Sequence, residues 1–306
     1  MTLVALAALV AVGWLGVAGP ATAAEPAPSV AGPLQPLITT SELVVGRNRF
    51  AFGLLRGGRL VPGAEVNVRV YDIREEVAQL VATAPAVYHP LEVIEQGRQV
   101  HIHPDGTRHL HGSASDVHGI YAAQLTLERA GPWGIEIVAR HGSDTETARL
   151  TVNVLETALG PLPGAPAPRS RNLIASDVTD LRLIDSSEPP DPRLHQTRIA
   201  DAIRQRRPQI IVFATPKYCT SRVCGPVLDV VRTLMPVYAT QVAFVHQEIW
   251  QDGRMETLAP TVTEWNLRTE PWTFLVDADG VVRARFEGLA TRREIEVALR
   301  QMLRLE

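Results

Sequence analysis

Hydrophobic and polar positions alternate along the first half of the chain, with the period of two that indicates strands with one buried face. The expected strands are Glu42–Val45, Arg49–Leu55, Glu65–Tyr71, Gly119–Leu127, Gly134–Arg140 and Glu146–Leu155. The stretch Arg74–Ala84 is expected to be a short helix or a loop. Several short strands at this spacing, with turns such as Gly57-Gly58 between them, predict an antiparallel β-sandwich.

After residue 171 the pattern changes to alternating strands and helices. The expected helices are about Asp191–Gln205, about Ser221–Met235 and one that starts at Thr291, and the expected strands are Gln209–Ala214, Gln241–Gln247, Trp272–Val276 and Val281–Phe286. Thr291 and Glu294 form a Thr-x-x-Glu capping box at the start of the last helix. The second half is therefore expected to be an α/β unit.

Stretches rich in Pro, Ala and Gly separate the expected units. Residues 25–36 read as a flexible tether and residues 158–171 as a linker between domains. A chain of 306 residues has room for two domains. We expect an immunoglobulin-like sandwich over 37–157 and an α/β domain over 172–306.

The N-terminal segment, residues 1–24, has an apolar run from Leu3 to Val17 and then the small-residue sequence Ala21–Ala24. This pattern indicates a secretory signal, although no Lys or Arg precedes Arg47. An uncleaved membrane anchor is the alternative. Either reading places the rest of the chain outside the cytoplasm, in a bacterial periplasm or at a cell surface, close to the membrane.

The net charge and the two cysteines limit the functions that the chain can have. The net charge of -3 provides no basic surface for a nucleic-acid backbone. The two cysteines, Cys219 and Cys224, are five positions apart in a chain expected to be exported, so we expect them to pair or act together. A bridge that closes so short a loop adds little stability, which favours a chemical role over a structural one.

The region from Asn172 to Glu306 resembles the thioredoxin-like superfamily. Strand 210–214 leads into the cysteine pair, Pro271 opens strand 272–276, and the acidic-Gly turn 277–280 precedes a closing helix. The resemblance implies a cis proline at Pro271 packed beside the two cysteines. Cys219 and Cys224 have four residues between them, where thioredoxins have two and Sco-type copper proteins three.

Within such a site the two cysteines have different expected roles. A thiolate is the reactive form, and a helix N-terminus stabilises it. Two residues five apart on one helix would diverge by about 140°. Cys219 must therefore lie in the loop before the helix to meet Cys224, which makes Cys219 the expected attacking thiol and Cys224 the resolving one. Lys217 and Arg222 lie close enough in sequence to stabilise the thiolate, or are ordinary surface charges.

Histidines suggest a second kind of site. His101, His103, His109, His111 and His118 fall within eighteen residues, and two His-x-His pairs flank a Pro-Asp-Gly turn. His-x-His on a strand points both rings to one face, and imidazole suits copper or zinc. The alternative is an exposed polar hairpin without a ligand. His246 could complete a Cys-Cys-His copper site if its ring faced Cys219, or could be an ordinary core histidine.

Three functions remain open from the sequence. The first is a thiol-disulfide oxidoreductase that cycles Cys219 and Cys224 with a protein partner and requires no cofactor. The second is a copper-binding, chaperone-like module that uses the cysteines with His246, or the histidine hairpin. The third is a non-catalytic binding or scaffold protein, in which the sandwich presents partners and the second domain is inactive. The expected sandwich itself resembles FixH/YtkA-like exported domains, because Gly131-Pro132-Trp133-Gly134 is similar to their Gly-x-Trp corner.

Overall fold

The computed structural model describes residues 33–305, apart from residues 58, 96–97, 104, 106, 115–117, 143 and 220–222. The expected export segment 1–24 and most of the expected tether lie outside these residues. In the described part of the chain, no helix is long and apolar enough to cross a membrane.

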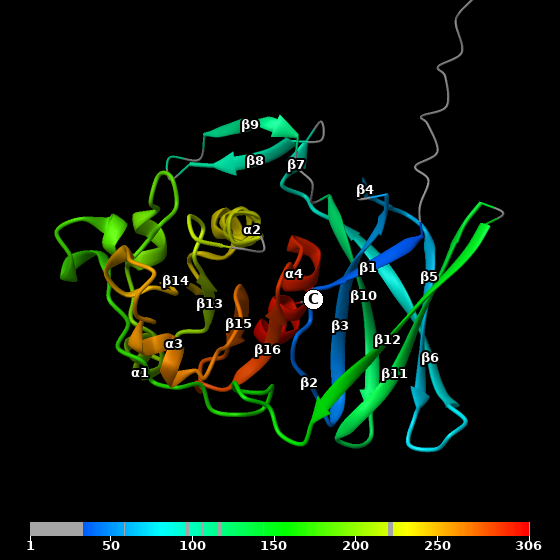
Figure 1. Ribbon diagram of the computed structural model, residues 1–306. Helices are drawn as coiled ribbons and strands as arrows, with labels where there is room; N and C mark the ends of the chain where they lie inside the picture. The colour runs from blue at the N-terminus through cyan, green and yellow to red at the C-terminus, as the bar shows by residue number, and fades with distance from the viewer. Residues whose placement is uncertain are drawn as a thin grey trace, which may run out of the picture. The chain divides into compact units, whose positions relative to one another are not determined.

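The first half of the chain forms one large curled sheet (Figure 1). Its strands are β1 (Leu34–Ile38), β2 (Leu43–Val44), β3 (Gly46–Arg56), β4 (Arg59–Leu60), β5 (Glu65–Asp72), β6 (Gln79–Pro90), β10 (Gly119–Leu127), β11 (Gly131–His141) and β12 (Asp144–Leu155). The strand order is β1-β3-β10-β6-β5-β11-β12-β2, and β4 pairs with β3. All neighbouring pairs are antiparallel except β12 with β2, which is parallel.

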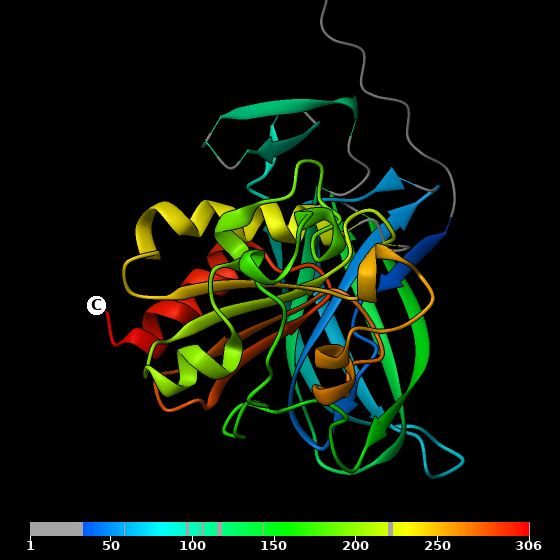
Figure 2. The same cartoon turned by 90° about the vertical axis from the view of Figure 1, so that its left-hand side faces the viewer.

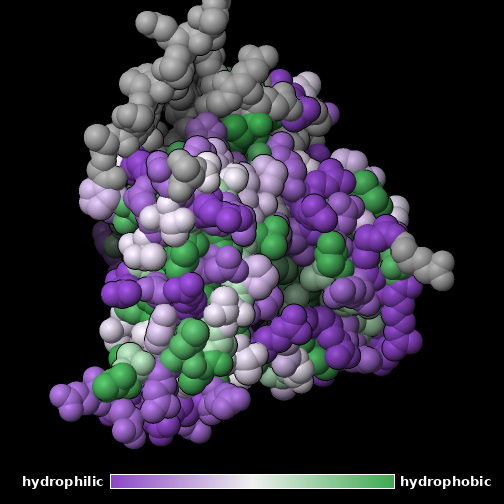
Figure 3. Space-filling model, turned by 90° about the vertical axis from the view of Figure 1, so that its right-hand side faces the viewer, coloured by the Kyte–Doolittle hydropathy of each residue, from purple (hydrophilic) through white to green (hydrophobic). Residues whose placement is uncertain are grey.

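The concave side of the curled sheet encloses its own apolar core. On β3, Phe50, Phe52 and Leu54 point into this core because side chains two apart share a face of a strand. Phe52 stacks on Tyr121 of β10 with ring centroids 5.8 Å apart. On the sheet's outer face, hydrophobic side chains are scattered among hydrophilic ones (Figure 3).

The second half contains a four-stranded mixed sheet with helices on both faces (Figure 2). Its strands, in the order β14-β13-β15-β16, are β13 (Gln209–Ala214), β14 (Ala243–Glu248), β15 (Trp272–Val276) and β16 (Val282–Glu287). The helices are α1 (Ile199–Arg204), α2 (Cys224–Tyr238), α3 (Pro260–Glu264) and α4 (Arg292–Leu303). Four short 3-10 helices are η1 (Ala175–Asp177), η2 (Leu181–Leu183), η3 (Pro192–His195) and η4 (Gln251–Gly253).

Each face of this sheet has its own core. Alternate residues of β13 divide between them: Ile210 and Val212 face α2 and α4, whereas Ile211 and Phe213 face α1 and α3. The core on the α2 side also includes Ala51 and Ile120 from the curled sheet. Both halves of the chain therefore share one hydrophobic core.

A small third sheet extends from the curled sheet over α2. Its strands are β7 (Ile94–Glu95), β8 (Arg98–Ile102) and β9 (Arg108–Ala114). Both views show the β8–β9 hairpin beside α2 (Figures 1 and 2). The segment that leads to it places Leu91 and Val93 in the core with α2.

Polar contacts join the curled sheet to the four-stranded sheet. Arg49 of β3 forms an ion pair with Glu294 of α4 at 2.8 Å and donates to the carbonyl of Leu289 at 2.9 Å. Arg285 of β16 lies 2.8 Å from Glu42. Burial alone would raise the pKa of Glu294, but the charge of Arg49 and its hydrogen bond hold that pKa below its usual value.

Most of the expected elements are present. The strands Gln209–Ala214 and Trp272–Val276 have the predicted bounds, and the Thr291–Glu294 capping box is confirmed. The expectation of a helix or loop at Arg74–Ala84 holds for the loop at residues 74–78 and is wrong from Gln79 onward, where β6 begins. The expected helix from Asp191 is divided into η3 and α1.

The predicted fold class and the resemblance to the thioredoxin-like superfamily are both wrong. The described residues are predominantly β, with 41% of them in strands and 20% in helices, and the largest sheet is the curled one. Eight strands of the first half follow one path through this sheet, β4 is added beside β3, and β7–β9 form the small third sheet, so these strands do not form an immunoglobulin-like sandwich. No distinct C-terminal thioredoxin-like domain is present, because residues 31–306 form one compact unit in which the four-stranded sheet shares its core with the curled sheet.

Replacing Glu294 by Gln tests the ion pair that joins the sheets. The variant keeps a side chain able to cap α4 but leaves Arg49 without its charged partner, so we expect a loss of about 3 kcal/mol in the free energy of unfolding. Urea denaturation measures this loss. Glu65→Gln, which breaks an exposed pair with Arg140, is the control and should cost less than about 1 kcal/mol.

The difference in the free energy of unfolding between wild type and Glu294→Gln is expected to depend on pH. A folded pKa below the ordinary value means that the ion pair stabilises the protein above about pH 4.3 and that this stability is lost as the pH falls through the folded pKa. The difference between wild type and Glu294→Gln should therefore shrink in acid. A difference that stays constant from pH 7 to about pH 3 would contradict this assignment.

Candidate functional site

Cys219 and Cys224 form a disulfide at the junction between β13 and α2. Their Cα atoms are 6.0 Å apart. Cys219 lies in the loop that follows β13, and Cys224 is the first residue of the 15-residue helix α2. The expected pairing of the two cysteines is confirmed.

The two sulfur-bearing residues differ in their access to solvent. Cys219 is half-buried, whereas Cys224 is fully buried and belongs to the core below α2. The backbone N–H of Cys224 donates to Sγ of Cys219 at 3.3 Å. A donor at the helix N-terminus that points to this sulfur would also stabilise a thiolate there.

The loop before the disulfide is fixed by backbone contacts. The N–H of Tyr218 donates to the carbonyl of Thr215 at 3.1 Å and closes a turn. The N–H of Lys217 donates to Oγ of Ser186 at 3.3 Å. The exposed Lys217 places its Nζ 5.4 Å from the ring centroid of Tyr218. Arg222, the other expected cation, lies outside the described residues.

Pro271 lies at the same end of the sheet as the disulfide. Phe213 pairs with Trp272 in the antiparallel register, so the residue before Trp272 lies beside the last residue of β13. The Glu270–Pro271 peptide bond is cis. Burial, together with the nearby charge of Glu248, raises the pKa of Glu270.

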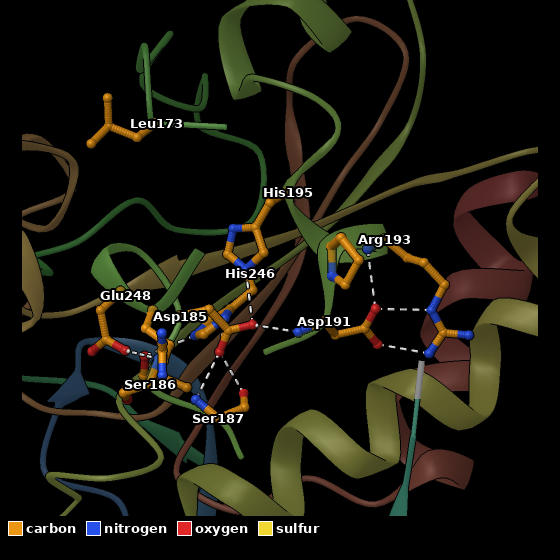
Figure 4. A network of polar contacts seen from close by, with 12 residues as sticks. Leu173, Asp185, Ser186, Ser187, Asp191, Arg193, His195, His246 and Glu248 are labelled. Carbon is orange, nitrogen blue, oxygen red and sulfur yellow. Dashed lines mark hydrogen bonds and ion pairs between the residues drawn. The ribbon is translucent and has the colours of Figure 1, made fainter. Parts of the chain in front are cut away.

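A buried polar cluster lies at the β14 edge of the four-stranded sheet, centred on Asp185 (Figure 4). The backbone N–H groups of Ser187 and Asp191 each donate to the Asp185 carboxylate at 2.9 Å. Nε2 of His195 lies 3.1 Å from the same carboxylate. These contacts fold segment 185–195 around one fully buried anionic side chain.

His246 of β14 faces this cluster. Its Nε2 lies 3.0 Å from the carbonyl oxygen of Ala214, and its Nδ1 lies 3.5 Å from Oδ1 of Asp185. The rings of His246 and His195 are in edge-to-face contact, with centroids 5.2 Å apart. Burial lowers the pKa of His195. Burial is also the largest effect on His246, but the charge of Asp185, the hydrogen bonds to Asp185 and Ala214 and the charge of Glu248 together outweigh it and raise the pKa of His246.

His246 thus contacts Asp185, Ala214 and His195, and neither cysteine sulfur is among its contacts with the described residues. The sequence did not single out Asp185 or His195. The available signal was weak: Asp185-Ser186-Ser187 is a turn-forming sequence, and Asp191-Pro192 marks the start of the short helix that carries His195.

The cluster extends to α2 and to the β8–β9 hairpin. Arg232 of α2 donates to Asp191 at 3.2 Å, and Arg193 pairs with Asp191 at 2.7 Å. Arg193 also donates to the carbonyl oxygen of His103 at 3.3 Å. Segment 185–195 therefore contacts both the helix that begins at Cys224 and the hairpin above it.

The histidine hairpin is partly described. His101 of β8 and His109 of β9 are cross-strand partners in the antiparallel register. His111 continues β9, and His118 is half-buried, with its carbonyl accepting from the N–H of Leu91 at 2.9 Å. The side chains of His101, His109 and His111, on which the expected metal site depends, lie outside the described part of the chain.

Comparisons with known proteins give no functional assignment. No family model and no curated protein matches the chain. One solved structure to which the chain is similar is a DUF4426 family protein from Pseudomonas aeruginosa PAO1, with 11% sequence identity and a TM-score of 0.23 over 37% of this chain and 77% of that one. A likeness at this level carries no argument about fold or function.

Proposed function

We propose that the protein is an extracytoplasmic thiol-disulfide oxidoreductase that exchanges electrons with a protein partner through Cys219 and Cys224. The observation that supports this proposal is the disulfide itself, formed between a half-buried loop sulfur and a fully buried sulfur at a helix N-terminus. A stable disulfide also fits an oxidising compartment outside the cytoplasm.

The difference in burial determines the order of bond changes. A thiolate of a partner dithiol attacks Sγ of Cys219, the Cys219–Cys224 bond breaks, and Cys224 leaves as a thiolate that takes up a proton. The second partner thiolate then attacks the partner's sulfur in the mixed disulfide and releases Cys219 as a thiolate. Two electrons pass from the partner to this chain, and the reverse sequence oxidises the pair again.

The N-terminal turn of α2 supports this chemistry. The Cys224 N–H contacts the sulfur of Cys219, which is released as a thiolate when the second partner thiolate resolves the mixed disulfide. This contact favours a thiolate at Cys219.

A trapping experiment tests the proposed roles of the cysteines. In Cys224→Ser the resolving thiol is absent, so a mixed disulfide between Cys219 and a substrate should persist. The variant is incubated with insulin as a defined disulfide substrate and examined by non-reducing mass spectrometry. We expect an adduct that dithiothreitol removes.

The matched control is Cys219→Ser, which leaves only the buried Cys224. We expect its adduct to form at least about 10-fold more slowly, because attack requires access to the sulfur. Equal rates for the two variants would contradict the assigned order. If neither variant forms an adduct and the wild type does not reduce insulin, the bridge is structural and the chain is a scaffold.

Differential alkylation measures the difference in solvent access between the two cysteines without a substrate. After mild reduction and brief exposure to iodoacetamide under native conditions, we expect Cys219 to be modified well before Cys224, because Cys219 is half-buried and Cys224 fully buried. Trypsin cleaves after Lys217, Arg222 and Arg232, which places the two cysteines on the separate peptides 218–222 and 223–232. Simultaneous modification of the two peptides would show that the buried position of Cys224 does not persist after reduction.

A further inference from the structure

Two imidazoles and a carboxylate converge in the buried cluster at the edge of the four-stranded sheet. One ligand atom each from Asp185, His195 and His246 lies within 4.8 Å of the other two. The three side chains are at most 1% exposed. Donors held at about 2.0–2.2 Å from one zinc ion lie roughly 3–4 Å apart, so small shifts would bring these three into coordination. We propose that Asp185, His195 and His246 form a binding site for a divalent transition metal ion, most suitably Zn²⁺.

The orientation of His246 supports a ligand at its second nitrogen. Nε2 lies 3.0 Å from the Ala214 carbonyl, which can only accept, so Nε2 carries the hydrogen. Nδ1 then lies 3.5 Å from Oδ1 of Asp185, and it has no closer polar partner among the described residues, although the ring is fully buried. A metal-binding histidine commonly donates its other N–H to a backbone carbonyl, which fixes the ring and leaves the free nitrogen for the ion.

The charge around the cluster also favours a cation. Asp185 and Glu248 are both buried, and their side-chain partners among the described residues are backbone N–H groups, a hydroxyl and the two histidines. Among the described residues, no guanidinium or ammonium group contacts either carboxylate. Buried carboxylates need a compensating positive charge. A divalent ion beside Asp185 would supply it.

A cavity borders His246, one of the three proposed ligands. It has a volume of about 240 Å³ and is lined by His246 and Glu248 of β14 together with Ile184 and Trp250. Each water in bulk liquid occupies about 30 Å³, so this space holds several. A water molecule in the cavity could also complete a tetrahedral set with the three protein ligands.

The donor types select the metal. Two imidazoles and one carboxylate suit Zn²⁺, and the cluster lacks the thiolate and thioether donors that favour copper(I). The disulfide is a separate feature, because its sulfurs are not among the contacts of His246. The zinc site is therefore independent of the proposed redox function.

Equilibrium dialysis of the full chain tests the site. The oxidised protein is stripped with a chelator, dialysed against Zn²⁺, washed, and analysed for bound zinc by plasma mass spectrometry. We expect about one zinc ion per chain, and less than about one fifth of that for Asp185→Asn and for His246→Gln. Binding below about 0.1 ion per wild-type chain would overturn the proposal, because a proton on His246 would then satisfy the cluster.

Two sets of control variants separate this site from the others. The double variant Cys219→Ser with Cys224→Ser and the double variant His101→Gln with His109→Gln should both retain the zinc. Loss of zinc in either would place the ion at the cysteines or at the hairpin and overturn the proposal.

Cobalt provides a readout on the wild-type chain that does not depend on how the variants fold. Co²⁺ bound to nitrogen and oxygen donors should show d–d absorption without a thiolate charge-transfer band. A charge-transfer band on the reduced wild-type protein, displaced by Zn²⁺, would assign the ion to the cysteines and overturn the proposal.

Discussion

The buried carboxylate of Asp185 organises the region around the disulfide. An ionised group removed from water must be surrounded by donors, and here the backbone of segment 185–195 provides two of them. Ser186, next to it, donates its N–H to Glu248 and accepts with its hydroxyl from Lys217. One anionic side chain thereby fixes a segment with little regular secondary structure, and that segment supports the loop that carries Cys219.

A second constraint is the interface between the two larger sheets. β3 contributes to two cores, since Phe50 and Phe52 pack inside the curled sheet while Ala51 packs toward α2. Next to this apolar contact, Arg49 satisfies carbonyls at the end of β16 and the carboxylate of Glu294. The polar and apolar contacts hold the same two surfaces together, so the geometry at the start of α2 depends on both halves of the chain.

The elements of the structure were easier to predict than their assembly. Period-two alternation identified β3, β5 and β10, but alternation is the same in a sandwich and in a single curled sheet, because it reports only which side of each strand is buried. β6 was missed because its first five residues, 79–83, are exposed on both faces and show no alternation. The order of elements in the second half suggested a separate α/β domain, yet sequence order does not reveal that Ala51 and Ile120 complete its core.

Only part of the candidate site could be predicted from the sequence. Two cysteines in a chain with no others are visible by inspection, and their pairing followed from their spacing. Asp185 and His195 were not visible, because a buried carboxylate and a solvated one look alike in sequence and their burial depends on contacts between segments far apart. His246 was noticed for its place on a strand, but its ring is directed to Asp185 and not to a sulfur.

The segment that leads into the β8–β9 hairpin has a consequence for the second half of the chain. Leu91 and Val93 are each at most 3% exposed, and they pack with α2, whose first residue is Cys224. A protein fragment starting at residue 172 would leave that side of the helix open to water and would lose the apolar wall that encloses the inner sulfur. The disulfide is thus sheltered by residues that precede it by more than a hundred positions.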